Sequence, residues 1–350
     1  MTAGKARTAG DFGLTCGMWP AGALNAITDV PGVRVGHCTL RDGDINTGVT
    51  AILPHGGNLF RTKVAAAAHV INGFGKTMGL MQIQELGAIE TPILLTNTLS
   101  VGTCATALIR DAIRQNPDIG RSTGTVNPVV GECNDGALSD IQALAIGEEH
   151  AFAALAAAHD GPVEQGNVGA GTGMSCFGFK GGIGSASRKL KLGGAQHHIG
   201  VLVLSNFGRA GDLILPDGRR PAPPQPALEE RGSIMVVLAT DVPLEHRQLE
   251  RVARRAGAGI ARLGSSWGHG SGDIAIAFST GTTIDHDESR DLVPRLALNE
   301  ARIDRLFQMT VEATQEAVLN SMLCAKAFTG RAGPHRPSLA DWLDGQAERR

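Results

Sequence analysis

Several short stretches of this sequence are apolar at almost every position, and they constrain the fold more than any other feature. The clearest runs are 199–204, 234–239 and 274–278. A strand with one face in water alternates apolar and polar residues, whereas an uninterrupted apolar strand is covered on both faces. Helix-forming stretches lie between these runs, so we expect a layered α/β fold with helices outside the sheets.

Turn signals and periodicity predict the other elements of the chain. The expected strands are a hairpin of 30–38 and 47–54, and single strands in 92–96, 127–136, 198–206, 233–240 and 273–279. The expected helices are 65–86 (broken by glycines), 104–115 (capped by Thr103), 137–158, 243–263, an amphipathic helix at 300–325, and a peripheral one near the end.

Composition and charge limit the classes of function. The chain has 350 residues with 42% hydrophobic, enough for a large core in one or two domains. A net charge of −2, the absence of tyrosine and only 4% aromatic residues argue against a nucleic-acid or membrane partner. No window resembles a membrane span or a targeting peptide, and the six scattered cysteines suit reduced thiols, so we expect a cytoplasmic protein.

The dipeptide Gly232-Ser233 joins a proline-rich polar segment, 216–231, to a strongly apolar strand. We expect the segment to be extended and exposed, because its prolines exclude a helix. A serine at a new chain N-terminus would carry its own general base, since a free α-amine has a pKa of about 7.7 to 8.0. Before cleavage its hydroxyl could attack the Gly232 carbonyl. The alternative is an ordinary serine after a linker between domains.

Other motifs have weaker interpretations. The tripeptide 75–77 lacks the first glycine of a P-loop, because Val70 stands there, and the glycine-rich stretch 166–173 has imperfect spacing for a dinucleotide loop. The pair His197-His198 has no third ligand at metal-binding spacing. His269 and Ser271 would point the same way along an extended segment without facing each other. Close backbone packing at the glycines is the favoured interpretation of 166–173.

Seven motifs, taken together and in order, closely resemble the L-aminopeptidase/D-esterase family, which includes the β-aminopeptidases. The resemblance extends from Asn25 to Phe328, nearly the whole chain. The motifs lie at 25–37, 47–54, 128–136, 166–173, 205–208, 232–233 and 270–273.

The resemblance implies a self-cleaving serine hydrolase of the N-terminal-nucleophile kind, built as a four-layer α-β-β-α sandwich. Cleavage would give a larger chain, 1–232, and a smaller one, 233–350, that together form one catalytic domain. Members commonly assemble as tetramers of such pairs. They act without a metal or organic cofactor on short peptides, amides or esters with a free amino group, releasing the N-terminal residue.

Carried over by position, the resemblance assigns catalytic roles to five residues. Ser233 is the nucleophile, and the side-chain amide of Asn206 donates to the oxyanion. Ser271 relays or stabilises the proton of the nucleophile, and the Gly272 N–H is a second oxyanion donor. Asp273 stands where β-aminopeptidases have glutamate, and its partner is open.

Two further positions are assigned to substrate binding. Glu132 matches the carboxylate that binds the ammonium group of the substrate. Asn134 stands where some members have tyrosine, which leaves the L-, D- or β-residue preference open.

Two alternative functions stay open on the sequence. One is an acyltransferase on a related self-cleaving scaffold, which would pass the acyl group to an amine instead of water. The other is a non-catalytic module that holds a nucleotide at 166–173.

Overall fold

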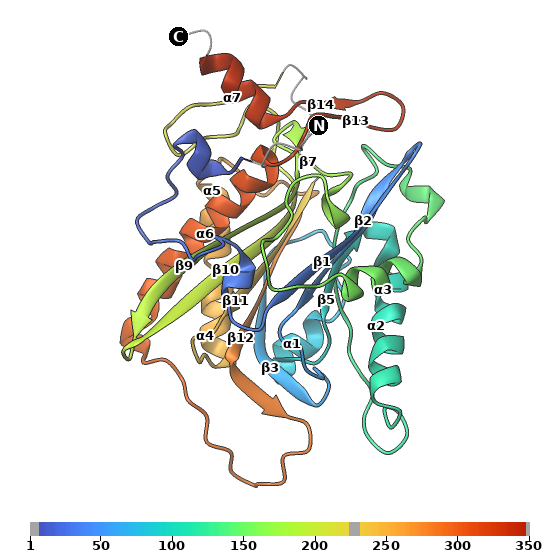
Figure 1. The fold of residues 1–350 in the computed structure, drawn as a ribbon, viewed down its shortest axis with the longest axis vertical. Helices are drawn as coiled ribbons and strands as arrows, with labels where there is room; N and C mark the ends of the chain where they lie inside the picture. The colour runs from blue at the N-terminus through green and yellow to red at the C-terminus, as the bar shows by residue number, and fades with distance from the viewer. Residues whose placement is uncertain (1–6, 224–231, 348–350) are drawn as a thin grey trace.

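The computed structural model describes residues 7–223 and 232–347, and its elements form two main β-sheets with helices beside them (Figure 1). The smaller sheet has the strand order β1 (Arg34–Asp42), β2 (Ile45–Leu53), β5 (Ile93–Asn97), β6 (Val129–Cys133). The larger sheet has the order β4 (Ala88–Ile89), β3 (Thr62–Gly73), β12 (Gly272–Asp285), β11 (Ser233–Thr240), β10 (Ala195–Asn206), β9 (Gly182–Leu192).

Most helices lie on the outer side of a sheet, but the helix at 80–86 contributes Ile83 to the core cluster that contains residues of both sheets. In Figure 1, α2 and α3 lie beside the smaller sheet at the right, and α4 and α6 beside the larger sheet at the left. The helices are α1 (Leu80–Leu86), α2 (Val101–Gln115), α3 (Glu148–Ala156), α4 (His246–Ala253), α5 (Ala256–Ala261), α6 (Ile303–Leu323) and α7 (Leu339–Ala347). Two small hairpins lie outside the two main sheets: β7 (Ser175–Cys176) with β8 (Phe179–Lys180), and β13 (Phe328–Thr329) with β14 (His335–Arg336).

Strand β11 shows why its sequence is apolar throughout. Ile234, Val236 and Leu238 belong to the core cluster that includes residues of α4, α5 and α6. The intervening side chains, such as Met235 and Val237, belong to a second cluster that contains residues of both sheets. Because successive side chains of a strand point to opposite faces, each face of β11 is buried in a different core. The predicted covering of both faces is confirmed.

The region 65–86 differs from the predicted helix. Its first half is strand β3, and only Leu80–Leu86 is helical. Alanine favours helices in isolation, but tertiary pairing overrides that preference. Ala65 to Ala68 pair with Ser279 to Ile276 of β12, and their small side chains enter the two cores alternately.

Other predicted helices are shorter than expected or interrupted. The stretch 137–158 is helical mainly in α3, and 243–263 is divided into α4 and α5. Helix α2 begins at Val101 and not after Thr103. The turn before it is capped by Asn97, whose Oδ1 accepts hydrogen bonds from the backbone N–H groups of Leu99 and Ser100.

Helix α6 is buried on almost all sides instead of one. Its carboxylates Glu312 and Glu316 pair with Arg188 of β9 at 3.3 and 2.7 Å. The expected peripheral position of the last helix is also wrong, because Leu339 and Leu343 of α7 are buried in the same core as α6.

The sequence also predicted an exposed proline-rich segment and the absence of a membrane span. The proline-rich segment lies partly outside the described residues, since 224–231 are not among them. Among the helices that are described, none has the length and apolar character needed to cross a bilayer.

Close contact between β9 and α6 gives a stability prediction. A Cβ added at Gly184 would lie 1.9 Å from the Ala317 carbonyl oxygen and 2.6 Å from the Ser321 nitrogen, both in the backbone of α6. We expect Gly184→Ala to destabilise the protein by about 1–3 kcal/mol, since the helix must shift. The matched control is Gly102→Ala in α2, where an added Cβ meets nothing within 4 Å. It should be neutral or stabilise by up to ~1 kcal/mol. Urea unfolding of both variants checks this, and equal effects would contradict it.

Candidate active site

Ser233 lies at the start of β11, in the middle of a row formed by three neighbouring strands. Its backbone is opposite Asn206 of β10 on one side and Gly272 of β12 on the other. The Gly272 N–H donates a hydrogen bond to Ser233 Oγ at 3.2 Å. Ser233 is 5% exposed and Asn206 is 7% exposed, so the row is largely shielded from water. The structure therefore brings these three sequence-predicted residues together.

Gly232 occupies a position that only glycine fits. A Cβ added there would lie 1.9 Å from the carbonyl oxygen of Asn206 and 2.7 Å from Phe207 Cα. Both are backbone atoms, which cannot move without disturbing β10. The close approach of Gly232 to Asn206 also places the Gly232-Ser233 peptide bond beside the predicted oxyanion donor.

Ser271 and Asp273 form a buried pair on either side of Gly272. Ser271 Oγ donates a hydrogen bond to Asp273 Oδ1 at 2.7 Å, and both residues are fully buried. The main-chain carbonyl of Ser271 accepts from the N–H of Phe74 at 3.3 Å. The sequence left the partner of Asp273 open, and the Ser271 hydroxyl is one such partner.

Asn206 has an amide group held at both ends. Its Oδ1 accepts a hydrogen bond from the Ser175 N–H at 2.9 Å, and its Nδ2 donates to the Asn134 carbonyl at 2.8 Å. A backbone N–H can only donate and a carbonyl can only accept, so these two bonds determine which end of the amide is oxygen. The side chain of Asn134 is exposed, and its Oδ1 accepts from the Gly136 N–H at 2.9 Å.

Glu132 reaches the site from β6 of the smaller sheet. It is 3% exposed, and its carboxylate accepts hydrogen bonds from the Lys76 N–H at 2.9 Å and from the Thr98 hydroxyl. A Cβ added at Gly75 would lie 3.6 Å from Glu132 Oε1 and 3.8 Å from Gly272 Cα. Glu132 and the Ser233 row thus border the same glycine, although they belong to different sheets.

Cys133 connects the two sheets directly beside Ser233. Its thiol donates to the Ser233 carbonyl at 3.3 Å and to the Leu204 carbonyl at 3.4 Å. Complete burial raises the pKa of this thiol well above its usual range, which keeps it a neutral donor. The sequence analysis missed this role, because scattered cysteines carry no recognisable spacing.

Asp135 is a second buried carboxyl close to Glu132 in sequence. It is fully buried, and within the described part of the chain neither of its oxygens has a hydrogen-bond partner at normal distance. Burial raises the pKa of Asp135 to about 6. The nearby side chains of Thr47 and Asn97 lower the pKa, but by less than burial raises it. The sequence predicted a strand in 127–136 but could not reveal that Asp135, just after the end of β6, faces inward.

The glycine-rich stretch 166–173 is packed rather than open. A Cβ added at Gly171 would lie 2.4 Å from the Ile183 nitrogen, and one at Gly173 would lie 2.4 Å from the Asn46 carbonyl oxygen. The glycines therefore allow a tight crossing of backbones, and the loop gives no support to a nucleotide site. Across residues 7–223 and 232–347, no three His, Cys, Asp or Glu side chains are grouped as metal ligands would be.

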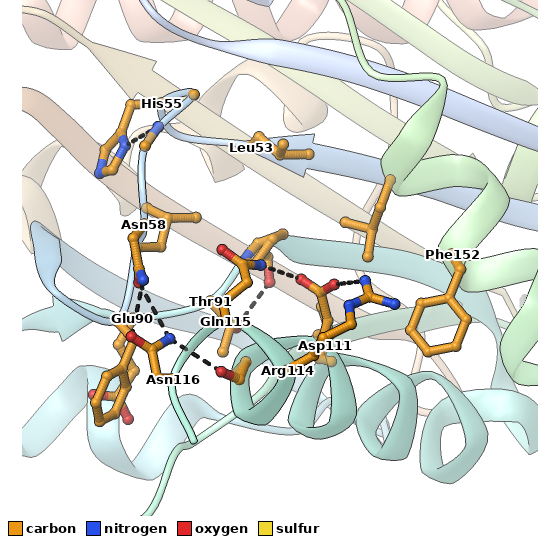
Figure 2. A pocket seen from close by; sticks show the side chains of 18 of the residues that line it. Leu53, His55, Asn58, Glu90, Thr91, Asp111, Arg114, Gln115, Asn116 and Phe152 are labelled. Atoms are coloured by element: carbon orange, nitrogen blue, oxygen red, sulfur yellow. Dashed lines mark hydrogen bonds and ion pairs between the residues drawn. The ribbon is translucent and has the colours of Figure 1, made fainter. Parts of the chain in front are cut away.

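A cavity of about 310 Å³ lies away from the predicted site residues, between the end of β2 and helices α2 and α3 (Figure 2). Its polar side chains have partners of their own: Asp111, for example, accepts from Arg114 and from Gln115.

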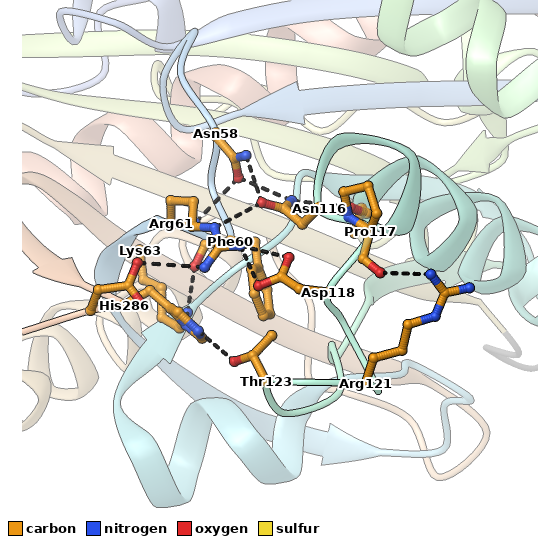
Figure 3. Close-up of polar contacts among 12 residues, drawn as sticks. Asn58, Phe60, Arg61, Lys63, Asn116, Pro117, Asp118, Arg121, Thr123 and His286 are labelled. Atoms are coloured by element: carbon orange, nitrogen blue, oxygen red, sulfur yellow. Dashed lines mark hydrogen bonds and ion pairs between the residues drawn. The ribbon is translucent and has the colours of Figure 1, made fainter.

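A polar cluster adjoins that cavity. There Arg61 binds Asp118 at 2.6 Å and Asn116 at 3.0 Å (Figure 3), which ties the start of β3 to the loop after α2. We interpret this cluster as structural.

Comparison with known proteins places these residues in a wider context. The model of a family described as Peptidase family S58 matches residues 25–336. A curated relative, beta-peptidyl aminopeptidase BapA of Sphingosinicella microcystinivorans, is 38% identical over 340 residues, covering 89% of this chain and 84% of the relative.

Solved structures are also similar over almost the whole chain. The PH0078 protein of Pyrococcus horikoshii is 45% identical with a TM-score of 0.90. The L-aminopeptidase D-Ala-esterase/amidase of Ochrobactrum anthropi, described as a variant of the Ntn hydrolase fold, is 35% identical with a TM-score of 0.88. Each match covers 98% of this chain and 99% of the other. The mixed α/β fold is therefore of the Ntn hydrolase type.

The buried carboxyl of Asp135 predicts a pH-dependent stability difference. Its pKa rises from 3.8 to about 6 on folding, so the folded state favours the protonated form. Stability from this group is present below pH 3.8 and is lost as the pH rises through about 6, a change of ~3 kcal/mol. We expect Asp135→Asn, which cannot ionise, to gain stability relative to the wild type by up to that amount between pH 4 and pH 7. Urea unfolding across this range tests it, and a constant difference would refute it.

Proposed function

Because the chain belongs to peptidase family S58, we propose that Ser233 is the nucleophile of a self-processing N-terminal-nucleophile aminopeptidase. The class of enzyme follows from the family and from the relatives: the protein is a hydrolase of the aminopeptidase and amidase kind. The observation that carries the assignment is the row of three strands in which Ser233 pairs with Asn206 and Gly272 and its hydroxyl accepts from the Gly272 N–H.

Self-cleavage is the first step of the proposal. Ser233 Oγ attacks the carbonyl carbon of Gly232, the C–N bond breaks, and the acyl group moves from nitrogen to oxygen while the nitrogen gains a proton. Water then hydrolyses the ester and leaves a carboxylate on chain 1–232 and a free amine on chain 233–350. The close contact of Gly232 with the Asn206 backbone supports this step, since it holds the bond within the site. We propose that the two chains stay together as a four-layer α-β-β-α sandwich.

The same hydroxyl then acts on substrates. The new α-amine of Ser233 accepts the hydroxyl proton as Oγ attacks the scissile carbonyl. The Asn206 amide and the Gly272 N–H stabilise the oxyanion, and a donor of this kind typically lowers the barrier by ~2.7–4 kcal/mol. The leaving amine takes the proton and departs, and water releases the acyl group from Ser233.

Ser271 and Asp273 have a supporting role in this scheme. The hydrogen bond from Ser271 to Asp273 orients the serine hydroxyl next to Gly272. With its own proton directed to Asp273, Ser271 Oγ has lone pairs to accept a bond from the α-ammonium of Ser233. That arrangement would stabilise the protonated amine formed during attack.

Glu132 provides selectivity for substrates with a free amino group. A buried carboxylate that accepts from two neutral donors can also bind an ammonium group, and such charge-assisted bonds are stronger than neutral ones. An N-terminal blocking group would remove that charge. We propose short peptides, amides and esters as substrates, with β-aminoacyl compounds among them because of the related β-peptidyl aminopeptidases.

We extend the proposal to the assembly and its location: a homo-tetramer of two-chain protomers in the cytoplasm. Leu292 and Leu296 are 87% and 76% exposed on the long segment after β12 (lower part of Figure 1), as a subunit contact would require.

Substitution of the nucleophile gives the first functional prediction. We expect Ser233→Ala to remain one chain of 36.4 kDa and to lose amidase activity, because both steps use the same hydroxyl. The control is Ser279→Ala, since Ser279 is a buried serine farther along β12 that bonds the Val242 carbonyl. Denaturing electrophoresis and hydrolysis of aminoacyl-anilides measure the two effects. A fresh, active wild-type enzyme that runs as one intact chain would exclude self-cleavage.

Neutralising Glu132 gives the second functional prediction. Glu132→Gln keeps the size of the side chain but removes its charge, so KM for an unblocked anilide should rise about 10- to 100-fold, as expected for a charged hydrogen bond of about 1.5–3 kcal/mol. The preference for free over N-acetylated substrates should fall with it. Glu90→Gln, at a buried carboxylate that accepts from Asn127, is the control. An unchanged preference would show that the ammonium is bound elsewhere.

A further inference from the structure

Lys180 is a lysine whose charge is completely enclosed by the protein. It is the second residue of β8 and has no exposed surface. Its Nζ donates three hydrogen bonds to main-chain carbonyls: Gly171 at 3.0 Å, Met174 at 2.8 Å and Gly181 at 2.8 Å. These bonds use every proton of the ammonium group. Burial lowers its pKa well below the usual value for lysine.

A buried ammonium group lowers the stability of the folded protein unless its interactions offset the loss of water. Desolvation of a charge costs several kcal/mol, and an apolar side chain of similar volume often serves packing as well or better. The three carbonyls belong to the end of the glycine-rich stretch and to the two sides of the β7–β8 hairpin. The Lys180 ammonium therefore bonds three carbonyls of one short segment, 171–181, to which Lys180 itself belongs.

One peptide unit of the hairpin bonds directly to a side chain of the active-site row. The Met174 carbonyl, which accepts from Lys180, and the Ser175 N–H, which donates to Asn206 Oδ1 at 2.9 Å, belong to the same peptide group. A trans peptide is planar and rigid, and its C=O and N–H point in opposite directions. Lys180 holds the carbonyl end together with the Gly181 N–H, which donates to the same oxygen at 3.0 Å, and the direction of the N–H end is then determined as well.

The direction of that N–H matters for the oxyanion donor. If the Asn206 amide were reversed, its NH₂ group would face the Ser175 N–H, donor against donor, and its oxygen would face the Asn134 carbonyl. The Ser175 N–H therefore keeps Oδ1 of Asn206 facing the hairpin and Nδ2 facing the Asn134 carbonyl. A cation at the carbonyl end also polarises the peptide, which strengthens the N–H as a donor.

The geometry points to Lys180 as a positioning residue for the oxyanion donor: its ammonium holds the Met174–Ser175 peptide, and that peptide holds the Asn206 amide for catalysis. The inference rests on the proposed function of Asn206.

The hairpin has other attachments, so loss of the ammonium need not unfold it. The Phe177 N–H donates to the Phe207 carbonyl at 2.8 Å, and Arg336 donates to the Ser175 hydroxyl at 3.1 Å. Neither bond holds the Ser175 N–H itself.

Lys180→Met is the main test, since methionine fills similar space without donors. We expect kcat for an aminoacyl-anilide, expressed per processed enzyme, to fall at least ~10-fold, a part of the 10²- to 10³-fold loss typical for removal of an oxyanion donor. KM should stay within about twofold, because Glu132 and not Asn206 binds the ammonium. Lys180→Gln keeps two N–H donors on a shorter chain and should retain more of kcat than the Met variant.

The control separates positioning from general stability. Asn320 in α6 is also fully buried, with bonds to the Ser185 carbonyl at 2.9 Å and from the Ala9 N–H at 2.8 Å, and none of these atoms belongs to segment 171–181. Asn320→Leu removes two buried hydrogen bonds and should lower the unfolding temperature, but it should leave kcat within twofold of the wild type.

Three outcomes would overturn the inference: a folded Lys180→Met enzyme with wild-type kcat, an equal loss of kcat in Asn320→Leu, or failure of both Lys180 variants to fold, which would assign Lys180 to stability alone. These differ from failure of the proposed function, in which the wild type itself shows no amidase activity or Ser233→Ala retains it.

Discussion

The alignment of β10, β11 and β12 is the constraint on which the rest of the site depends. It places Asn206, Ser233 and Gly272 opposite one another at the ends of three neighbouring strands. Because side chains alternate along a strand, a shift of one residue in either pairing would turn a donor or the hydroxyl to the opposite face. The apolar residues of β11 prevent such a shift, since each belongs to one of two separate cores. The packing of β11 in the two cores therefore also determines the geometry of the site.

The smaller sheet contributes further groups to the site formed by the larger sheet. Strand β6 provides the Glu132 carboxylate and the Cys133 thiol that bonds the Ser233 carbonyl, and the residue after the strand, Asn134, provides the carbonyl that accepts from Asn206. These groups are largely buried, where hydrogen bonds are strong and unpaired polar groups are costly. Main-chain donors and acceptors make most of the contacts. The site is thus held by the backbone of two sheets, with few side chains that could move independently.

Prediction from the sequence succeeded where one local rule was sufficient. The strand from Ser233 to Thr240, the hairpin of β1 and β2 and the end of α2 before Pro117 are confirmed, since apolar runs and turn residues act locally. The region 65–86 was wrong because alanine favours a helix until a partner strand is present. Cys133 and Lys180 could not be found, because their partners are carbonyl groups that leave no mark in the sequence.

By itself the sequence determined the chemistry that is available: a serine after a glycine at the start of a buried strand, and ordered motifs that resemble one family of hydrolases. It also determined the layered α/β class, since uninterrupted apolar strands require cover on both faces. Only the tertiary structure decided that Asp273 bonds Ser271, that Asn134 contributes its carbonyl, and that Lys180 bonds the peptide group whose N–H donates to Asn206. The physical reason is that these contacts join residues through backbone atoms, whose positions depend on how strands and loops distant in sequence are packed together.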